Sequence, residues 1–171
     1  MKESSKSLNN QGIILAQSGD FKEAIACFKK AISLENFNYR LWFNLGITYR
    51  DAGQTQNAVH ALEKAFQLND SSQDVIESLS AICFELGLLE ESKTYCNYGL
   101  DIQPLNSHLW NNLGVVEFNM ENYEAACESF ECAVSINPYY KDAIFNLKDT
   151  YSELKNETGM KECQAKLDEL R

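Results

Sequence analysis

Proline and glycine are scarce in this chain of 171 residues, which has two prolines and eight glycines. Both residue types interrupt helices, so their scarcity permits long helical segments. Histidine is also rare: His60 and His108 are the two present, and neither has a second histidine at metal-ligand spacing. The sequence contains no nucleophile elbow, zinc-protease motif, phosphate-binding loop or dinucleotide fingerprint. These absences argue against an enzyme and predict neither a cofactor nor a metal site.

Long apolar runs are missing too, and none reaches the length needed to span a bilayer. The residues from Met1 to Lys6 are polar and lead into no apolar signal region. We therefore expect a cytoplasmic protein, or one that has lost a targeting segment.

The six cysteines include no CxxC pair and fit no zinc module. This spacing predicts reduced, structural thiols in a reducing compartment. Cys83 and Cys96 fall at packing positions of the repeat described below, so we expect them to be buried. The offset of Cys27 and Cys163 in the same repeat predicts that they lie on an outer helix face.

Basic residues are few: the chain has 15 lysines and arginines and 25 aspartates and glutamates, which gives a net charge of −10. A nucleic-acid backbone or an anionic membrane would be repelled by such a chain. Partners with basic segments are favoured instead. The alternative is that the acidic surface serves only solubility.

What the sequence does have is a pattern of apolar and small residues that recurs every 34 residues, five times. Its first position is large and apolar: Leu8, Trp42, Ile76, Trp110 and Ile144. The position four residues later is mostly very small: Gly12, Gly46, Ser80, Gly114 and Lys148. A second small position follows: Ala24, Ala58, Ser92, Ala126 and Met160. A period of this length is typical of a stacked repeat array.

The pattern predicts two amphipathic helices in each repeat. Spacings of 0, 4 and 7 residues bring the pattern positions to one helix face, at about 100° per residue. Gly19, Gly53 and Gly87 mark turns within repeats, and Pro104 and Pro138 mark turns between them. We expect an all-α fold, a right-handed α-solenoid of five antiparallel helix pairs. The whole chain, 1–171, is then one array with repeats at about 5–38, 39–72, 73–106, 107–140 and 141–171.

The pattern residues resemble the tetratricopeptide repeat family. The family pattern W-x2-L-G-x2-Y is nearly complete from Trp42 to Tyr49, and the run from Trp110 to Gly114, with later pattern residues up to Pro138, matches again. The resemblance covers almost the whole chain and implies a superhelix that binds proteins or peptides. The fifth repeat departs from the pattern, with Lys148 and Met160 in place of small residues and a polar last helix. We expect this degenerate pair to cap the array.

The family resemblance also implies that the first helix of each repeat lines a concave groove. One position of that face carries amides in four of the five repeats: Asn10, Asn44, Ser78, Asn112 and Asn146. Such a ladder offers donors and acceptors to the backbone of an extended peptide. Further groove residues predicted on this face are Arg40, Phe43, Arg50, Glu77, Phe84, Asn111, Phe118, Phe145 and Asp149. The alternatives are that the asparagines reflect composition and that the phenylalanines pack against neighbouring helices.

Charge on the predicted groove is uneven. The first two repeats offer Lys6, Arg40 and Arg50, opposed mainly by Asp51. The last three offer six carboxylates, opposed at most by His108: Asp74, Glu77, Glu85, Asp142, Asp149 and Glu153. We expect a ligand segment whose lysine or arginine lies over repeats three to five and whose apolar side chains lie near Phe84 and Phe118.

The sequence thus predicts a non-catalytic scaffold that binds a peptide or helical segment of a partner protein in its groove and is monomeric when the groove is empty. A structural, self-associating module and a regulatory adaptor that recruits an enzyme stay open as alternatives. The family branch that clamps Glu-Glu-Val-Asp tails is disfavoured. Its first-repeat lysine and asparagine fall here on Asn9 and Ile13, and its third-repeat lysine and arginine fall on Asp74 and Ser78.

Overall fold

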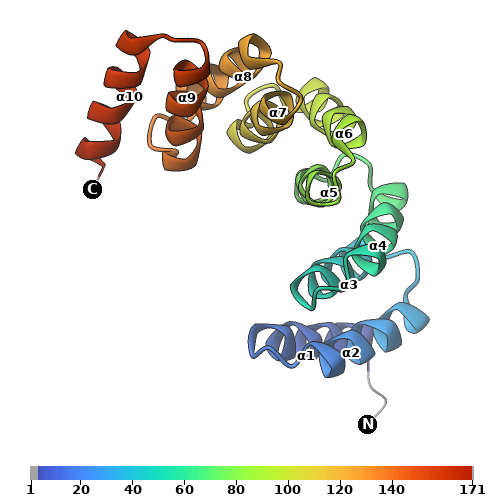
Figure 1. The fold of residues 1–171 in the computed structure, drawn as a ribbon. Coiled ribbons are helices and arrows are strands. Elements are labelled where there is room, and N and C mark those ends of the chain that lie inside the picture. The colour runs from blue at the N-terminus through green and yellow to red at the C-terminus, as the bar shows by residue number, and fades with distance from the viewer. Residues whose placement is uncertain (1–3, 171) are drawn as a thin grey trace. The chain divides into compact units, whose positions relative to one another are not determined.

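The computed structural model describes residues 4–170, which form ten α-helices and no strand (Figure 1). In chain order they are α1 (Ser5–Gln17), α2 (Phe21–Leu34), α3 (Tyr39–Asp51), α4 (Thr55–Leu68), α5 (Gln73–Glu85), α6 (Leu89–Ile102), α7 (Ser107–Asn119), α8 (Tyr123–Ile136), α9 (Lys141–Glu153) and α10 (Glu157–Glu169). The predicted all-α class, with five helix pairs, is confirmed.

The chain forms two compact units, which divide between Ile82 and Cys83 inside α5. In the first unit α1 packs on α2, α2 on α3, and α3 on α4. In the second unit the corresponding contacts run from α6 through α10, each helix packing on the next. The first helices of neighbouring repeats also touch, α1 with α3 and α7 with α9. The predicted groove residues lie on these first helices and on α5.

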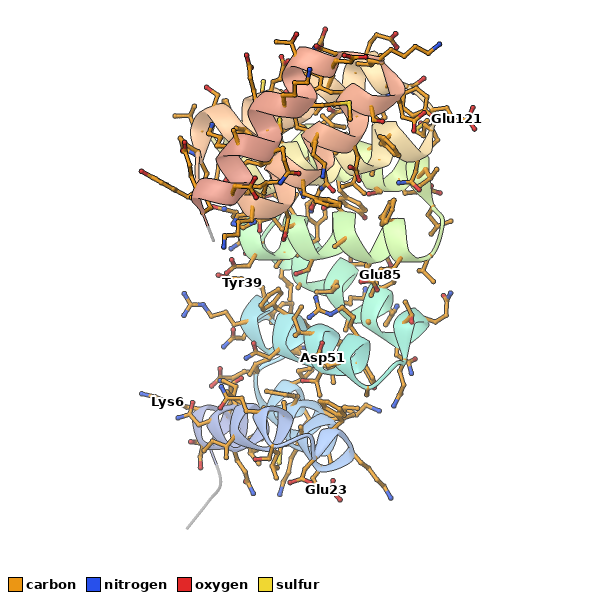
Figure 2. All side chains as sticks on the ribbon, turned by 60° about the vertical axis from the view of Figure 1, so that its left-hand side comes forward. Lys6, Glu23, Tyr39, Asp51, Glu85 and Glu121 are labelled. Atoms are coloured by element: carbon orange, nitrogen blue, oxygen red, sulfur yellow. The ribbon has the colours of Figure 1, made fainter. Side chains whose placement is uncertain are left out.

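Each helix pair is closed by a three-residue turn whose middle residue has a positive φ. Glycine occupies that position at Gly19, Gly53 and Gly87, with φ between 72° and 83°. Glu121 and Lys155 take the same place in the last two turns, with φ of 62° and 55° (Figure 2 labels Glu121). The next residue's N–H bonds back to the helix in all five turns, for example from Asn122 to the Glu117 carbonyl at 2.9 Å. This is the hydrogen bond of a Schellman motif, which needs the left-handed residue.

Glycine on the first helix of a pair allows a buried side chain of the second helix to lie against its backbone. A Cβ at Gly12 would come within 2.8 Å of Phe28, and one at Gly114 within 2.6 Å of Phe130. Both rings are almost completely buried and cannot move aside. The glycines of the sequence pattern therefore set the separation of the two helices in the first and fourth pairs.

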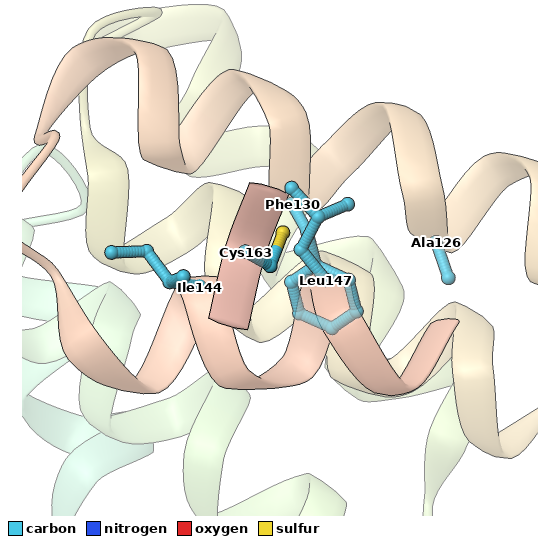
Figure 3. Close-up of a cluster of buried hydrophobic side chains, with 5 residues drawn as sticks. All are labelled: Ala126, Phe130, Ile144, Leu147 and Cys163. Carbon is cyan, nitrogen blue, oxygen red and sulfur yellow. The ribbon is translucent and has the colours of Figure 1, made fainter. Parts of the chain in front are cut away.

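The core of the last two repeats shows how the pairs share apolar surface. Ala126 and Phe130 from α8, Ile144 and Leu147 from α9, and Cys163 from α10 form one buried cluster (Figure 3). The cluster joins three helices of two neighbouring repeats, so neither repeat buries its apolar face alone.

The predicted outer position of Cys163 is wrong, because its side chain is only 7% exposed and belongs to that cluster. The reason is a change of packing in the last pair. Gly159 is buried on α10, and a Cβ there would come within 2.6 Å of the Tyr151 ring of α9. In this pair the glycine lies on the second helix and the ring on the first, the reverse of the first and fourth pairs. The buried face of α10 therefore passes through Gly159 and Cys163 rather than Met160 and Gln164. Cys83 and Cys96 are buried as predicted, and Cys27 is half-buried.

The non-glycine residues at positive φ predict a stabilising substitution. Glu121→Gly removes the strain of a left-handed residue, which costs about 1–2 kcal/mol. The greater flexibility of glycine in the unfolded chain opposes this gain in stability. We expect urea unfolding to give a net gain of roughly 0.5–1 kcal/mol. Glu128→Gly, the same change inside α8, is the control and should lose about 1 kcal/mol. A loss of stability in Glu121→Gly would contradict this account of the turns.

The corrected position of Cys163 predicts unequal effects of two equivalent substitutions. Cys163→Ser places a hydroxyl in the apolar cluster and should lower the free energy of unfolding by about 1–3 kcal/mol. Cys27→Ser, at the corresponding position of the first repeat, should change it by less than about 0.5 kcal/mol. Thermal unfolding of both variants tests this, and equal shifts in Tm would refute the packing described for α10.

Candidate functional site

Two cavities occur at equivalent places, one in each unit. The cavity in the first unit, of about 220 Å³, lies between α1 and α3. It is lined by Ile13, Ala16, Gln17, Phe28, Phe43, Asn44, Ile47, Thr48 and Asp51. The cavity in the second unit, of about 120 Å³, lies between α7 and α9. It is lined by Val115, Phe118, Asn119, Phe130, Asn146 and Asp149.

The two sets of lining residues correspond through a shift of three repeats. Phe28 and Phe130, the rings that lie against the glycines, form part of both the core and the cavity wall. Asn44 and Asn146 are the equivalent amides on the second of the two first helices. The repeat therefore builds cavities at equivalent positions between α1 and α3 and between α7 and α9.

The asparagines at the cavities are held by hydrogen bonds between neighbouring first helices. Asn44 donates its side-chain N–H to Asn9 Oδ1 at 2.9 Å, and Asn146 donates to Asn111 Oδ1 at 3.0 Å. Each side-chain amide has a second N–H and a carbonyl oxygen beyond this bond. The pairing fixes the orientation of the amide and leaves it capacity for a ligand backbone. Two members of the predicted ladder, Asn44 and Asn146, thus have a structural role.

Charge differs between the two cavities. In the first unit, Asp51 accepts hydrogen bonds from Arg50 Nε and Nη2 at 3.1 and 2.9 Å (Figure 2 labels Asp51). In the second unit, Asp149 is exposed, and no ion pair reaches it from residues 4–170. The neighbouring Lys148 is directed elsewhere: its Nζ lies 3.5 Å from Gln164 Oε1 of α10 and 4.7 Å from the Phe145 ring centroid.

The structure brings five of the predicted groove residues to the cavities. Phe43 and Asn44 line the first cavity, and Phe118, Asn146 and Asp149 line the second.

The other predicted residues lie outside the two cavities in differing degrees of exposure. Asn10, Arg40 and Phe145 are exposed; Arg50, Glu77, Ser78, Phe84 and Asn112 are half-buried; and Asn111 is 7% exposed. Asn111 therefore acts as the hydrogen-bond partner of Asn146 more than as a surface residue. Phe145, half exposed, is the most accessible of the four predicted aromatics, while Phe118 packs edge-on against Tyr123.

Sequence reasoning missed several wall residues. Ile13 and Val115 occupy one repeat position, and Gln17 and Asn119 another, one helical turn later. Their common offset was a usable signal, since residues four apart share a helix face. Phe28 and Phe130 are core rings, and nothing in the sequence pattern indicates that a core ring also borders an opening.

The side chains whose pKa values are shifted make structural contacts. Burial, followed by the nearby Glu131 carboxylate, raises the pKa of the Cys127 thiol to about 11. A hydrogen bond to Glu117 raises the pKa of Lys93, which pairs with that buried carboxylate at 2.8 Å. A hydrogen bond to Tyr39 raises the pKa of Arg40 and lowers that of Tyr39. Raised thiol pKa values leave little thiolate at neutral pH, so Cys127 is not an activated nucleophile.

In the part of the chain that the structure describes, no three or more histidine, cysteine, aspartate or glutamate side chains are grouped to hold a metal ion. No helix in that part is both long and apolar enough to cross a membrane.

Family models for the tetratricopeptide repeat match residues 3–71 and 107–140, which together make up more than half of the chain. The chain therefore belongs to the tetratricopeptide repeat family, as the sequence resemblance predicted. The family fold is generally a non-catalytic module for protein–protein interaction.

Among curated relatives, the chain is 31% identical over 101 residues to the "Protein STIP1 homolog" of Dictyostelium discoideum, covering 58% of this chain and 18% of that protein. It is 27% identical over 129 residues to "BBSome complex member BBS4" of Xenopus tropicalis, covering 75% of this chain and 25% of that one. The chain thus spans a quarter or less of the length of these relatives.

Solved structures share the fold at low sequence identity. A crystal structure of MamA matches with a TM-score of 0.85 and 23% identity, covering 93% of each chain. YrrB, described as "a TPR protein with an unusual peptide-binding site", matches with a TM-score of 0.77 and 18% identity, covering 98% of this chain and 87% of its own. The MamA likeness supports the all-helical repeat fold.

The hydrogen bond between Asn146 and Asn111 predicts a measurable coupling. Asn146→Ala, Asn111→Ala and the double variant form a double-mutant cycle. The loss of stability in the double variant should differ from the sum of the two single losses by about 0.5–1.5 kcal/mol. Urea unfolding of the four proteins measures this. Additive losses would mean that the two amides do not stabilise the contact between α7 and α9.

Proposed function

We propose that the chain is a non-catalytic binding module that holds a segment of a partner protein against the first helices of its repeats. The observation that carries the proposal is the recurrence of one cavity in both units, each bordered by a buried phenylalanine and an oriented asparagine.

The size of the cavities favours a peptide over a small-molecule ligand. Pockets for cofactors and drug-sized ligands measure about 300–1,000 Å³. The two cavities here measure about 220 and 120 Å³ and open on one helix face. Each has room for one side chain of a segment whose backbone runs over the surface. The free donor and acceptor capacity of Asn44 and Asn146 is suited to that backbone.

The partner segment carries basic residues in this proposal. Asp142, Asp149 and Glu153 are exposed on α9, at spacings that bring them to neighbouring positions of one helix surface. Exposed carboxylates raise the association rate of a positively charged segment and orient it. The chain's net charge of −10 acts in the same direction.

A second candidate function is assembly through the edges of the repeats. Phe37, Leu105 and Tyr139 occupy one position of the turns between repeats and are 83%, 80% and 75% exposed. Apolar side chains displayed at a regular position are typical of contact surfaces. Analytical ultracentrifugation separates the two functions: a module that uses its first helices is monomeric alone, whereas one that assembles through these side chains forms oligomers that Phe37→Ser weakens.

Selection of a phage-displayed random dodecapeptide library on the whole chain tests the proposed function. We expect enriched peptides, made synthetically, to bind wild type with micromolar Kd and to lose about tenfold or more on Phe43→Ser or Phe145→Ser, both on first helices. Glu128→Ser, on the exposed face of α8, is the control and should stay within about twofold. Failure to enrich any peptide, or equal losses in the control, would refute binding at the first helices.

A further inference from the structure

The two cavities lie at equivalent positions of the repeat but differ in size and in charge. Asp142 and Asp149 of the second unit correspond, three repeats earlier, to Arg40 and Ile47 of the first. The carboxylate beside the second cavity is therefore replaced by an aliphatic side chain in the first. Cavities that differ in charge select different side chains.

In the second unit, the cavity combines an apolar wall with an unpaired carboxylate. Val115, Phe118 and Phe130 provide the apolar surface, and Asp149 lies at the rim. Lys148, the nearest cation in sequence, is bound at Gln164 and over the Phe145 ring, so it does not compensate Asp149. Lysine and arginine carry an aliphatic stem that packs on apolar surface and a charged end that stays at the edge.

In the first unit, the corresponding cavity has no unpaired carboxylate. Ile47 occupies the position of Asp149, and Asp51 is paired with Arg50 at 2.9 Å. Exposed Arg40 adds a further positive charge on the same helix. A basic side chain would lose its hydration there without gaining an unpaired anion, whereas an apolar side chain would meet Ile13, Phe28 and Ile47.

Resting on the proposed function, we infer that each cavity is a side-chain subsite of its own unit: the cavity bordered by Asp149 takes a lysine or arginine of a partner segment, and the cavity bordered by Ile47 takes an uncharged apolar side chain. Asp149 recognises the charge of the ligand, and Phe130 and Val115 pack on its stem. Ile47 excludes that charge from the other subsite.

The experiment uses the peptides enriched by the phage-displayed library on the full chain, and two variants. Asp149→Asn keeps the shape of the side chain and removes its charge. For the best peptide, a version with norleucine in place of its basic residue keeps the stem and removes the ammonium. At low salt, Asp149→Asn should weaken the basic peptide about three- to tenfold and leave the norleucine peptide within about twofold.

The second variant, Ile47→Asp, gives the first cavity the carboxylate of the second, with Ile47→Asn as the uncharged control. A new selection on Ile47→Asp should enrich basic residues at a peptide position where wild type and Ile47→Asn enrich apolar ones. Circular dichroism of each variant checks that its helices are intact.

The outcomes separate the two levels of the proposal. Peptides that bind at the first helices but show no basic residue, or whose basic residue is equally sensitive in wild type and Asp149→Asn, would overturn the subsite assignment and leave the proposed function standing. Absence of any enriched peptide would overturn both.

Discussion

The contact between a glycine on one helix and a buried side chain on its partner helix sets how closely the two helices of a pair approach. Phe28 and Phe130 lie so close to Gly12 and Gly114 that no Cβ fits between them, and Leu62 lies equally close to Gly46. In the first and fourth repeats, the rings also form a wall of the opening toward the neighbouring first helix. In these two repeats the fold and the candidate site thus depend on one arrangement.

Much of the fold could be predicted from the sequence because the repeat is periodic. Glycine at Gly19, Gly53 and Gly87 marks the left-handed residue of three turns, and the pattern positions identify the paired helices. The last two turns were harder, since Glu121 and Lys155 adopt the same φ without the residue that signals it. Tertiary packing holds these turns in place despite the local strain.

The last pair and the asparagines mark the limits of pattern reasoning. Counting along the repeat put Cys163 outside, but Gly159 and Tyr151 exchange the roles of glycine and ring, and this turns a different face of α10 inward. The position of Asn44 and Asn146 on the first helices was predictable, while their bonds to Asn9 and Asn111 depend on the distance between two helices. The sequence period alone does not determine the distance between neighbouring first helices.

Differences between equivalent positions are where an otherwise regular array acquires specificity. Ile47 in the first cavity and Asp149 in the second occupy the same repeat position, so the two cavities differ in charge there. Asp51 is paired with Arg50, whereas no ion pair reaches Asp149 from residues 4–170. A carboxylate that is already paired with a cation of the protein attracts a ligand cation less strongly.

Amide hydrogen–deuterium exchange with and without a bound peptide tests the central claim most directly, because it locates the ligand without any substitution. The account predicts that binding slows exchange in the first helices, at α3 around Asn44 or at α9 around Asn146, and leaves the turns that carry Phe37, Leu105 and Tyr139 unchanged. Slower exchange confined to those turns, with the first helices unchanged, would contradict it.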